Sequence, residues 1–246
     1  MRALILGGCG FIGSSIARDL VKSDDVAQVR LVDVSLDSTK VAKSVKTSPK
    51  VSMEYSDVTK SFSALVHMMQ ENDVVINCVG PYSEFSIDIV KAAVEAGVDY
   101  VDVCDNCSVT KQIFDLDALA KRAGVTICTG LGSSPGTTNM LAKYGADKLD
   151  AVDEIEVFSV IALINPIGRA GLTQAMGQFI GNVTQYIDGH LVDVPAGSEE
   201  EEVMFMEPFG KTEVYYARHP EPFTLPLYIP GVKRVINKAT FSPPSV

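Results

Sequence analysis

Three glycines near the N-terminus have the spacing of a loop that holds phosphate groups. Gly8, Gly10 and Gly13 form the pattern Gly-x-Gly-x-x-Gly between an apolar run and a helical pattern, the context in which this motif is informative. We expect Gly8 to make a tight turn, Gly10 to let a pyrophosphate approach the backbone, and Gly13 to let helix and strand pack closely. The helix start would offer unsatisfied N–H groups and a positive dipole end to the phosphates. These glycines, with Phe11 and Ile12 between them, are therefore predicted to bind a dinucleotide.

A carboxylate at the end of the second predicted strand indicates which dinucleotide is bound. Asp33 can accept hydrogen bonds from both hydroxyl groups of an adenosine ribose, and its charge would repel a 2′-phosphate. No arginine follows it closely in the sequence, as expected for a site that does not hold that phosphate. The sequence therefore predicts NAD as the cofactor in preference to NADP.

Further cofactor-binding candidates stand after the later predicted strands. Asp57 and Val58 follow the third strand, where this architecture contacts adenine, although Asp57 fits a helix cap before Ser61 equally well. The segment that closes the fourth strand is expected to line the pyrophosphate and the nicotinamide ribose: Asn77, Cys78, Val79 and Gly80. A helix start after the sixth strand is favourable for contact with an anion or a ribose: Ser134, Pro135, Gly136 and Asn139.

These candidates must be positioned by a repeating pattern of strands and helices. Short runs rich in Val and Ile, without polar alternation, predict parallel strands that are covered on both faces: Ala3–Leu6, Val29–Asp33, Val51–Tyr55, Val74–Cys78, Tyr100–Cys104 and Val125–Thr129. Helical patterns lie between them, and Gly97 and Gly124 are placed to end two helices in the left-handed conformation. The pattern predicts an N-terminal Rossmann domain, a doubly wound parallel sheet, over residues 1–135.

The pattern changes near Ser134, and residues 136–246 are predicted to form a second α/β domain with a mixed sheet. Helices are predicted at Thr137–Leu149 and about Leu172–Ile187, and strands at Glu154–Ile164, Val203–Phe205, Thr212–Ala217 and Val232–Asn237. The acidic run Glu199–Glu202 is expected to be a solvated loop. We expect this substrate domain to be incomplete, and its open sheet edge to be covered in a homodimer.

Composition excludes several classes of protein. The 246 residues are 46% hydrophobic and 21% charged, as in ordinary globular proteins. A formal net charge of −10 makes nucleic acid and anionic membranes unfavourable partners. The uncharged run Ala170–Ile187 carries too many polar groups for a membrane span. Five cysteines, an odd number, without a signal-peptide pattern indicate a reduced, cytoplasmic protein. A single Cys-x-x-Cys, Cys104 to Cys107, does not suffice for a metal site.

Several longer motifs resemble the saccharopine dehydrogenase superfamily, including its lysine 6-dehydrogenase-like members. The resemblance lies in Gly7–Gly13, Val74–Tyr82, Ala96–Asp102, Gly132–Asn139 and His219–Pro226. It implies an NAD(P)-dependent oxidoreductase that acts on a small amino-acid or amine substrate, lysine- or saccharopine-like. Hydride would pass between a C–N bond of the substrate and the nicotinamide, giving an imine that water opens.

Such a reaction needs a proton acceptor and groups that bind the substrate. Tyr82, just after the fourth strand, is placed near a nicotinamide, although it fits a packing aromatic equally well. Asp105, past the fifth strand, can pair with a substrate ammonium or serve as an ordinary turn residue. His219, in a proline-rich loop of the second domain, is the best acid–base candidate, although histidines in such loops often only hydrogen-bond to backbone. These three residues are the predicted catalytic groups.

Two other interpretations remain open. Tyr144 and Lys148 match the Tyr-x-x-x-Lys of extended short-chain dehydrogenases and epimerases, in which the lysine lowers the pKa of the tyrosine so that it acts as a base. The glycine motif also resembles that family. Alternatively, a second domain that stops short would leave a non-catalytic NAD-binding module.

Overall fold

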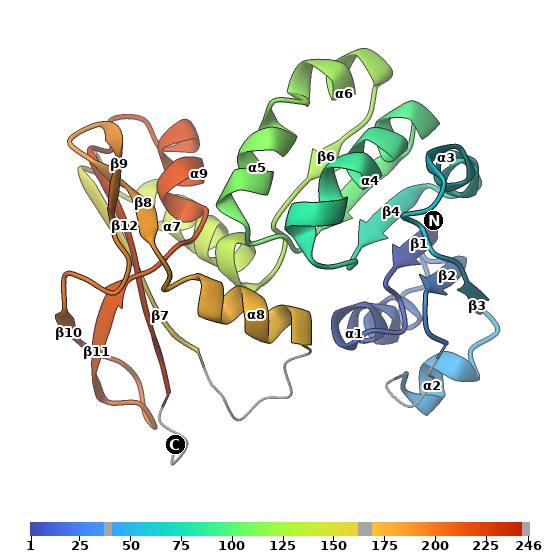
Figure 1. The fold of residues 1–246 in the computed structure, drawn as a ribbon, viewed down its shortest axis with the longest axis horizontal. Coiled ribbons are helices and arrows are strands. Elements are labelled where there is room, and N and C mark those ends of the chain that lie inside the picture. The colour runs from blue at the N-terminus through green and yellow to red at the C-terminus, as the bar shows by residue number, and fades with distance from the viewer. Residues whose placement is uncertain (37–40, 162–168, 243–246) are drawn as a thin grey trace. The chain divides into compact units, whose positions relative to one another are not determined.

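The chain divides into two compact units, unit 1 (Met1–Leu131) and unit 2 (Gly132–Val246). The structure is a computed structural model that describes residues 1–36, 41–161 and 169–242, and Figure 1 shows both units. None of the helices in these ranges has the length and apolar character needed to cross a membrane.

Unit 1 contains a parallel sheet with the strand order β3-β2-β1-β4-β5-β6 (Figure 1). The strands are β1 (Arg2–Leu6), β2 (Gln28–Asp33), β3 (Val51–Tyr55), β4 (Val74–Asn77), β5 (Asp99–Asp102) and β6 (Ile127–Cys128). This order confirms the predicted doubly wound Rossmann sheet. The order in which the chain adds strands to the sheet reverses between β1 and β4. At such a point the carboxyl ends of the strands leave a crevice for a ligand.

Burial on both faces explains why these apolar runs form strands. Leu4 and Leu6 of β1 contribute to the core on one face of the sheet, and Ala3 and Ile5 contribute to the core on the other. Successive side chains of a strand point to opposite faces, so a run without polar residues satisfies both cores. All four of these side chains are fully buried.

Helices cover both faces of this sheet (Figure 1). They are α1 (Phe11–Leu20), α2 (Lys43–Lys46), α3 (Phe62–Gln70), α4 (Tyr82–Ala96), α5 (Cys107–Phe114) and α6 (Asp117–Ala123). The Ser61 hydroxyl accepts the Ala64 N–H at the start of α3, and the Asn106 side chain accepts two N–H groups of α5. Gly97 and Gly124 end α4 and α6 in the left-handed conformation, as predicted.

Unit 2 contains the predicted mixed sheet, with the strand order β10-β11-β12-β8-β9 and with β7 paired to β12. Its strands are β7 (Glu154–Ile161), β8 (Asn182–Ile187), β9 (His190–Pro195), β10 (Glu201–Met204), β11 (Lys211–Tyr216) and β12 (Arg234–Phe241). Its helices are α7 (Thr138–Ala146), α8 (Arg169–Gly177) and α9 (Glu221–Tyr228). Strand β12 runs parallel to β7 and antiparallel to β11 and β8.

The prediction of one helix over Leu172–Ile187 is wrong in its second half. Helix α8 ends at Gly177, and Asn182–Ile187 forms β8, which pairs with β9 across an Asp188-Gly189 turn. Both turn residues have a positive φ, 50° and 80°, the combination for which hairpins use an Asp-Gly pair. That pair is a signal that the prediction overlooked.

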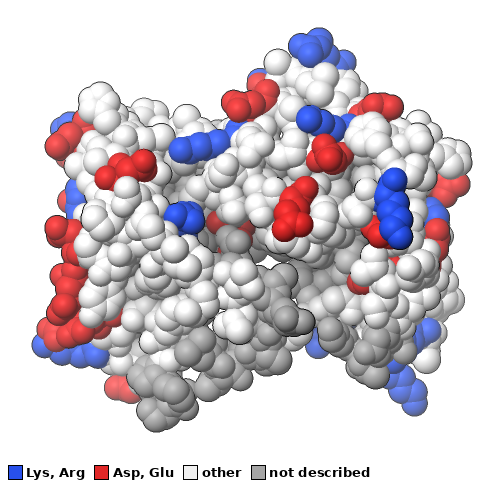
Figure 2. Space-filling model, in the orientation of Figure 1, with Lys and Arg blue, Asp and Glu red and all other residues white. Residues whose placement is uncertain are grey.

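Smaller differences concern the ends of the predicted elements. The predicted strand Glu154–Ile164 forms β7 as far as Ile161, and its remaining positions lie outside the described residues. The acidic run is only partly loop, because Glu201 and Glu202 form part of β10. Exposed acidic side chains, among them Glu202 and Glu213, gather along the β10–β11 edge of unit 2 (Figure 2).

Candidate functional site

The glycine turn between β1 and α1 is built by backbone contacts that exclude side chains. Gly7 has φ +72°, so the left-handed position of the turn belongs to Gly7, which precedes the predicted Gly8. A Cβ atom on Gly8 would lie 2.9 Å from the Cα of Leu31 on β2, and one on Gly13 would lie 2.4 Å from the carbonyl oxygen of Gly7. Gly8 and Gly13 are therefore required for close packing of the turn.

The N-terminus of α1 is open to an anion. Its cap residue is Gly10, no side chain caps the helix, and its first turn holds no acidic residue. Phe11 and Ile12, the first two helical residues, are 53% and 45% exposed. A Cβ on Gly10 would come within 3.1 Å of the Gly7 oxygen, so this position also favours glycine. Backbone N–H groups at a helix start that no side chain caps can bind a pyrophosphate.

The carboxylate of Asp33 is held by two backbone N–H groups at the end of β2. Its Oδ2 accepts the Cys9 N–H at 3.0 Å, and its Oδ1 accepts the Ser35 N–H at 3.1 Å. Carboxylate oxygens have about four acceptor positions between them, so capacity remains for the hydroxyl groups of a ribose. The bond to Cys9 also ties this carboxylate to the glycine turn.

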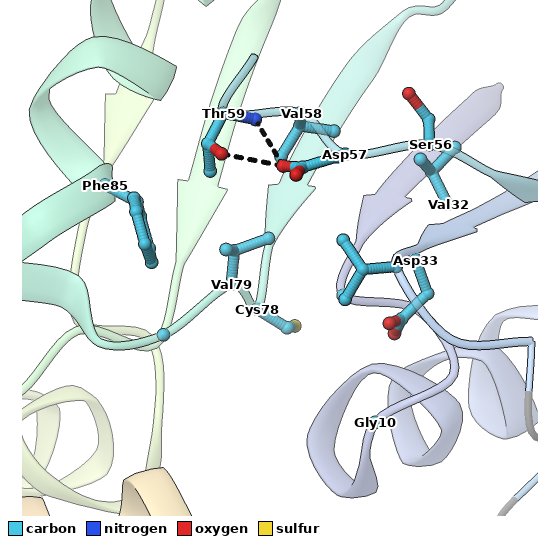
Figure 3. A pocket seen from close by; sticks show the side chains of 13 residues that line it. Gly10, Val32, Asp33, Ser56, Asp57, Val58, Thr59, Cys78, Val79 and Phe85 are labelled. Carbon is cyan, nitrogen blue, oxygen red and sulfur yellow. Dashed lines mark hydrogen bonds between the residues drawn. The ribbon is translucent and has the colours of Figure 1, made fainter.

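A cavity of about 370 Å³ lies at the carboxyl ends of β1, β2, β3 and β4. Its lining residues are Gly7, Gly10, Val32, Asp33, Val34, Ser56, Asp57, Val58, Thr59, Cys78, Val79, Gly80 and Phe85. Figure 3 shows Asp33 and Phe85 on opposite sides of Cys78 and Val79. The structure thus brings candidates from four predicted loops onto one cavity.

Some lining residues were missed, and others of the predicted set lie elsewhere. Most of the missed residues are chain neighbours of predicted ones: Gly7, Val32, Val34, Ser56 and Thr59. Phe85, inside α4, has no comparable sequence signal. Gly8 and Gly13 support the turn, and Asn77 is fully buried.

Asp57 adds a second carboxylate to the cavity (Figure 3). Its Oδ1 accepts the Thr59 hydroxyl at 2.7 Å and the Thr59 N–H at 3.1 Å. These two hydrogen bonds hold the pKa of Asp57 below its usual value. The cap of α3 is Ser61, so the alternative role of Asp57 as that cap is wrong. Asp57 is an ionised acceptor at the cavity.

Asn77 acts through a buried hydrogen-bond network behind the cavity. Its Oδ1 accepts the Val79 N–H at 2.9 Å, and its Nδ2 donates to the Tyr100 hydroxyl at 2.9 Å. That hydroxyl donates to Asp102 at 2.9 Å, and Asp102 also accepts the Gly130 N–H at 2.7 Å. Asn77 therefore fixes the loop that carries Cys78, Val79 and Gly80.

Two of the predicted catalytic residues lie in unit 1. Tyr82 is the first residue of α4 and packs against the core. Burial raises its pKa, and the charges of nearby groups, Asp105 among them, raise it further. The Tyr82 hydroxyl therefore stays protonated at neutral pH and is suited to donate a hydrogen bond. Asp105 lies in the loop between β5 and α5.

The cysteines near these residues are unreactive thiols. Burial, with the charge of Asp102, raises the pKa of Cys78 to about 12. The same two causes raise the pKa of Cys104. A thiol with such a pKa is protonated at neutral pH and is a poor nucleophile and metal ligand.

The third predicted catalytic residue, His219, lies in unit 2 in a cluster with Ser134. His219 Nδ1 is 2.5 Å from Glu221 Oε2 and 3.3 Å from the Ser134 hydroxyl. Ser134 and Thr138 donate to Glu221 Oε1 at 2.5 and 2.6 Å. Glu221 and Thr138 were missed. The signal for Glu221 is its position in the first turn of α9, where the helix dipole favours a carboxylate.

The other predicted residues of this segment surround the cluster. Pro135 is buried and Gly136 is half-buried, both in the turn Ser133–Thr137. Asn139 donates from Nδ2 to the Thr224 hydroxyl at 2.9 Å. Asn139 therefore joins the start of α7 to α9, and the contact of these residues with a cofactor stays a prediction.

Tyr144 and Lys148, the residues of the short-chain dehydrogenase alternative, also lie in unit 2. Tyr144 is 66% exposed on α7. Lys148 follows the end of that helix, with its Nζ 5.0 Å from the centre of the Tyr144 ring.

Comparisons with known proteins agree with this fold. Residues 3–128 match the family model described as saccharopine dehydrogenase NADP binding domain. A putative trans-acting enoyl reductase of Mycobacterium tuberculosis is 26% identical over 160 residues, 62% of this chain and 37% of that protein. The NADP(+), L-glutamate-forming saccharopine dehydrogenase of Saccharomyces cerevisiae is 25% identical over 146 residues, 59% of this chain and 30% of that protein.

A solved structure shows the same fold. Apo saccharopine dehydrogenase (L-Glu forming) from Saccharomyces cerevisiae has a TM-score of 0.71 at 21% identity, covering 97% of this chain and 55% of that chain. This chain spans about a third of the length of the two relatives named above.

Proposed function

Since this chain belongs to the family of the saccharopine dehydrogenase NADP binding domain, we propose that it is an NAD(P)-dependent oxidoreductase. The observation that carries the proposal is one cavity that joins the glycine turn, the uncapped start of α1 and the anchored carboxylate of Asp33. A phosphate-binding backbone beside a ribose-binding carboxylate is the requirement for a dinucleotide.

We further propose that NAD is preferred to NADP. Asp33 and Asp57 both line the cavity, and a 2′-phosphate would meet negative charge there. Among the described residues that line the cavity there is no Lys or Arg to neutralise that phosphate. The description of the family names NADP, whereas the case for NAD rests on the residues that line this cavity.

The proposed reaction removes a hydride from the carbon of a C–N bond in an amino acid that is lysine- or saccharopine-like. The nicotinamide, when bound, accepts this hydride. In the proposal His219 takes up the proton from the amine, the protonated Tyr82 hydroxyl donates a hydrogen bond, and Asp105 pairs with a substrate ammonium. The saccharopine dehydrogenase name of the yeast relative supports this substrate class.

The enoyl reductase name of the mycobacterial relative supports a second candidate, reduction of a C=C bond. The two candidates differ in the group that accepts or loses hydride, so substrates can separate them. The short-chain dehydrogenase alternative needs Tyr144 as a base, so the Tyr144→Phe variant should lose activity almost completely only under that alternative.

The test is a screen with the full chain at fixed NAD. We expect NADH formation, followed by absorbance, with lysine, saccharopine or a carboxyalkyl polyamine, and no NADH oxidation with an enoyl thioester. NADH oxidation with the enoyl thioester, without NADH formation from the other compounds, would indicate an enoyl reductase. Tight NAD binding with no turnover on any of these compounds would indicate a non-catalytic NAD-binding module.

We also propose a cytoplasmic homodimer. Strand β9 pairs only with β8 among the described strands, and an exposed sheet edge of this kind favours pairing with another chain. Sedimentation equilibrium should give twice the mass of the chain, and a monomer at micromolar concentration would contradict the proposal.

A further inference from the structure

The cavity of unit 1 presents different chemistry on its different sides. Gly10 and Asp33 contribute a bare helix start and a carboxylate, and Figure 3 shows the Phe85 ring on the other side of Cys78 and Val79. Of the described residues that line the cavity, only Phe85 is aromatic. Phosphates bind at the N–H groups of a helix start, whereas a flat base binds against an aromatic face. The lining side chains therefore indicate which part of a dinucleotide lies where.

Phe85 is fixed by the core of unit 1. It lies in the first turn of α4 and packs, like Val79, against the buried cluster that contains Val58. Phe85 is half-buried, because it contacts this core and also lines the cavity. A ring that the fold already holds loses little conformational entropy when a ligand packs against it. Phe85 is therefore a preformed apolar surface for a ligand.

Negative charge keeps phosphate groups away from this part of the cavity. Asp57, which precedes Val58, lines the cavity with its Oδ1 held by Thr59, and its charge repels an anion. Lys60 Nζ lies 3.6 Å from Asp57 Oδ2, but the lysine side chain is 77% exposed, so solvent and salt screen its charge. An uncharged ring therefore fits beside Phe85, and phosphates fit at the start of α1.

The base that enters this cavity follows from the ribose that carries it. In the proposed function Asp33 binds the ribose of the adenosine half, and Asp33 and Phe85 line the same cavity. We propose that Phe85 is the surface against which the adenine ring packs, and that it makes the cavity selective for a purine base. This inference rests on the proposed function through the role of Asp33. A purine has two fused rings and a pyrimidine has one, so a purine gains more contact with the Phe85 ring.

The sequence contains no tryptophan, which permits a direct test of contact with a base. Phe85→Trp places a single indole at the cavity of the full chain, and a base in contact with an indole ring quenches its fluorescence. We expect adenosine monophosphate to quench the emission. Nicotinamide mononucleotide, which carries the same ribose phosphate, should leave the emission unchanged. No quenching by adenosine monophosphate, or quenching by nicotinamide mononucleotide alone, would overturn the proposal.

Phe114→Trp is the matched control for the fluorescence experiment. Phe114 is half-buried like Phe85, but it is the last residue of α5 and does not line the cavity. Helix α5 follows the carboxyl end of β5, and its eight residues span about 12 Å, so Phe114 lies away from that edge of the sheet. Adenosine monophosphate should leave the emission of this variant unchanged. Equal quenching of both variants would overturn the proposal, because the signal would not arise from contact at Phe85.

Calorimetric titration measures how much the ring contributes to affinity. The wild type should bind adenosine monophosphate about tenfold or more tightly than uridine monophosphate, and Phe85→Ala should lose most of this preference through weaker binding of the purine. Phe85→Leu retains an apolar side chain against the core, so its midpoint of unfolding should stay near that of the wild type while the purine preference falls. Equal affinity of the wild type and both variants for adenosine monophosphate would refute the role of Phe85.

Two further results separate this inference from the proposed function. If NADH binds to the wild type and Phe85→Ala does not weaken that binding, the role of Phe85 is wrong and the proposed function stands. If adenosine monophosphate binds through Phe85 but no substrate is turned over with NAD, the proposed oxidoreductase activity fails and the purine site stands.

Discussion

Each glycine of the turn after β1 has its own physical constraint. Gly13 must lack a Cβ because α1 lies against the backbone of Gly7, whereas Gly10 lies at the open helix start that lines the cavity. The first constraint concerns folding and the second concerns the ligand, so substitutions should separate them.

Gly13→Ala should destabilise unit 1 by about 1–3 kcal/mol, the range for inserting a methyl group into packed structure, because the neighbouring atom is backbone and cannot move away easily. Urea unfolding measures this change in the free energy of unfolding. Gly145→Ala in α7, where a Cβ would meet nothing within 4 Å, is the control and should stabilise its helix by roughly 0.5 kcal/mol. Equal stability of Gly13→Ala and the wild type would contradict the packing described for this turn.

The carboxylate of Glu221 makes unit 2 sensitive to acid. Its pKa is lowered in the folded state, so its contribution to stability is present above the pKa of an unfolded Glu, about 4.3. That contribution is lost as the pH falls through the lower, folded pKa.

The wild type should therefore lose more stability than the Glu221→Gln variant between pH 5 and pH 3. Urea unfolding at several pH values, followed by circular dichroism, measures the difference. Parallel pH dependence of the two proteins would show that Glu221 is not held as an anion in the folded state.

At the scale of elements, Asp102 joins the carboxyl ends of three neighbouring strands. It ends β5, accepts the Thr129 hydroxyl and the Gly130 N–H after β6, and accepts the Tyr100 hydroxyl that also binds Asn77 of β4. Burial raises its pKa in spite of these hydrogen bonds, and the network positions the loop on the cavity.

Asp102→Ala should cost about 3 kcal/mol or more, since each buried donor left without an acceptor costs roughly 1–3 kcal/mol. It should also weaken NADH binding, because the loop from Cys78 to Gly80 loses its support. Asp99→Ala, at the other end of β5, removes one exposed hydrogen bond to Thr126 and should cost about 1 kcal/mol or less. A smaller loss for Asp102→Ala than for Asp99→Ala would refute this role of the network.

The elements of unit 1 were predictable because their strands are buried on both faces. An apolar run such as Ala3–Leu6 has few other structures open to it, and the loops at the strand ends follow from the order of the strands. The uncharged run over Leu172–Ile187 is not an apolar run of this kind. In β8 the alternate residues Val183 and Gln185 are buried. This burial arises from the pairing of β8 with strands distant in the sequence, which the run itself does not indicate.

The candidate site residues were predictable from the sequence only where the order of the strands determines their position. Those at the ends of predicted strands, such as Asp33 and Val79, could be placed from sequence because the edge of a parallel sheet gathers them. The pairing of Ser134 with Glu221 joins segments far apart in the chain, and no local pattern records it. Phe85 reaches the cavity from within α4, which helical spacing alone does not reveal.

At the scale of the whole molecule, net negative charge opposes an anionic ligand. The formal net charge is −10, and the cavity itself is lined by Asp33 and Asp57. The affinity for NADH should therefore rise two- to threefold as salt screens this repulsion, because the Debye length falls from about 30 Å at 0.01 M to about 8 Å at 0.15 M.

Titrations at the two salt concentrations measure this effect, with uncharged adenosine as the control ligand. Adenosine should bind equally well at both concentrations. An NADH affinity that falls with salt would mean that positive charge outside the described lining residues dominates the site.

The most direct test of the account is a calorimetric titration of the full chain with NADH and with NADPH, for the wild type and for Asp33→Ser. The wild type should bind NADH at least about tenfold more tightly than NADPH, a difference of about 1.4 kcal/mol. Asp33→Ser should lose most of that preference by binding NADPH more tightly. Absence of binding by either dinucleotide, or equal affinity of the wild type for both, would contradict the role assigned to the glycine turn and Asp33.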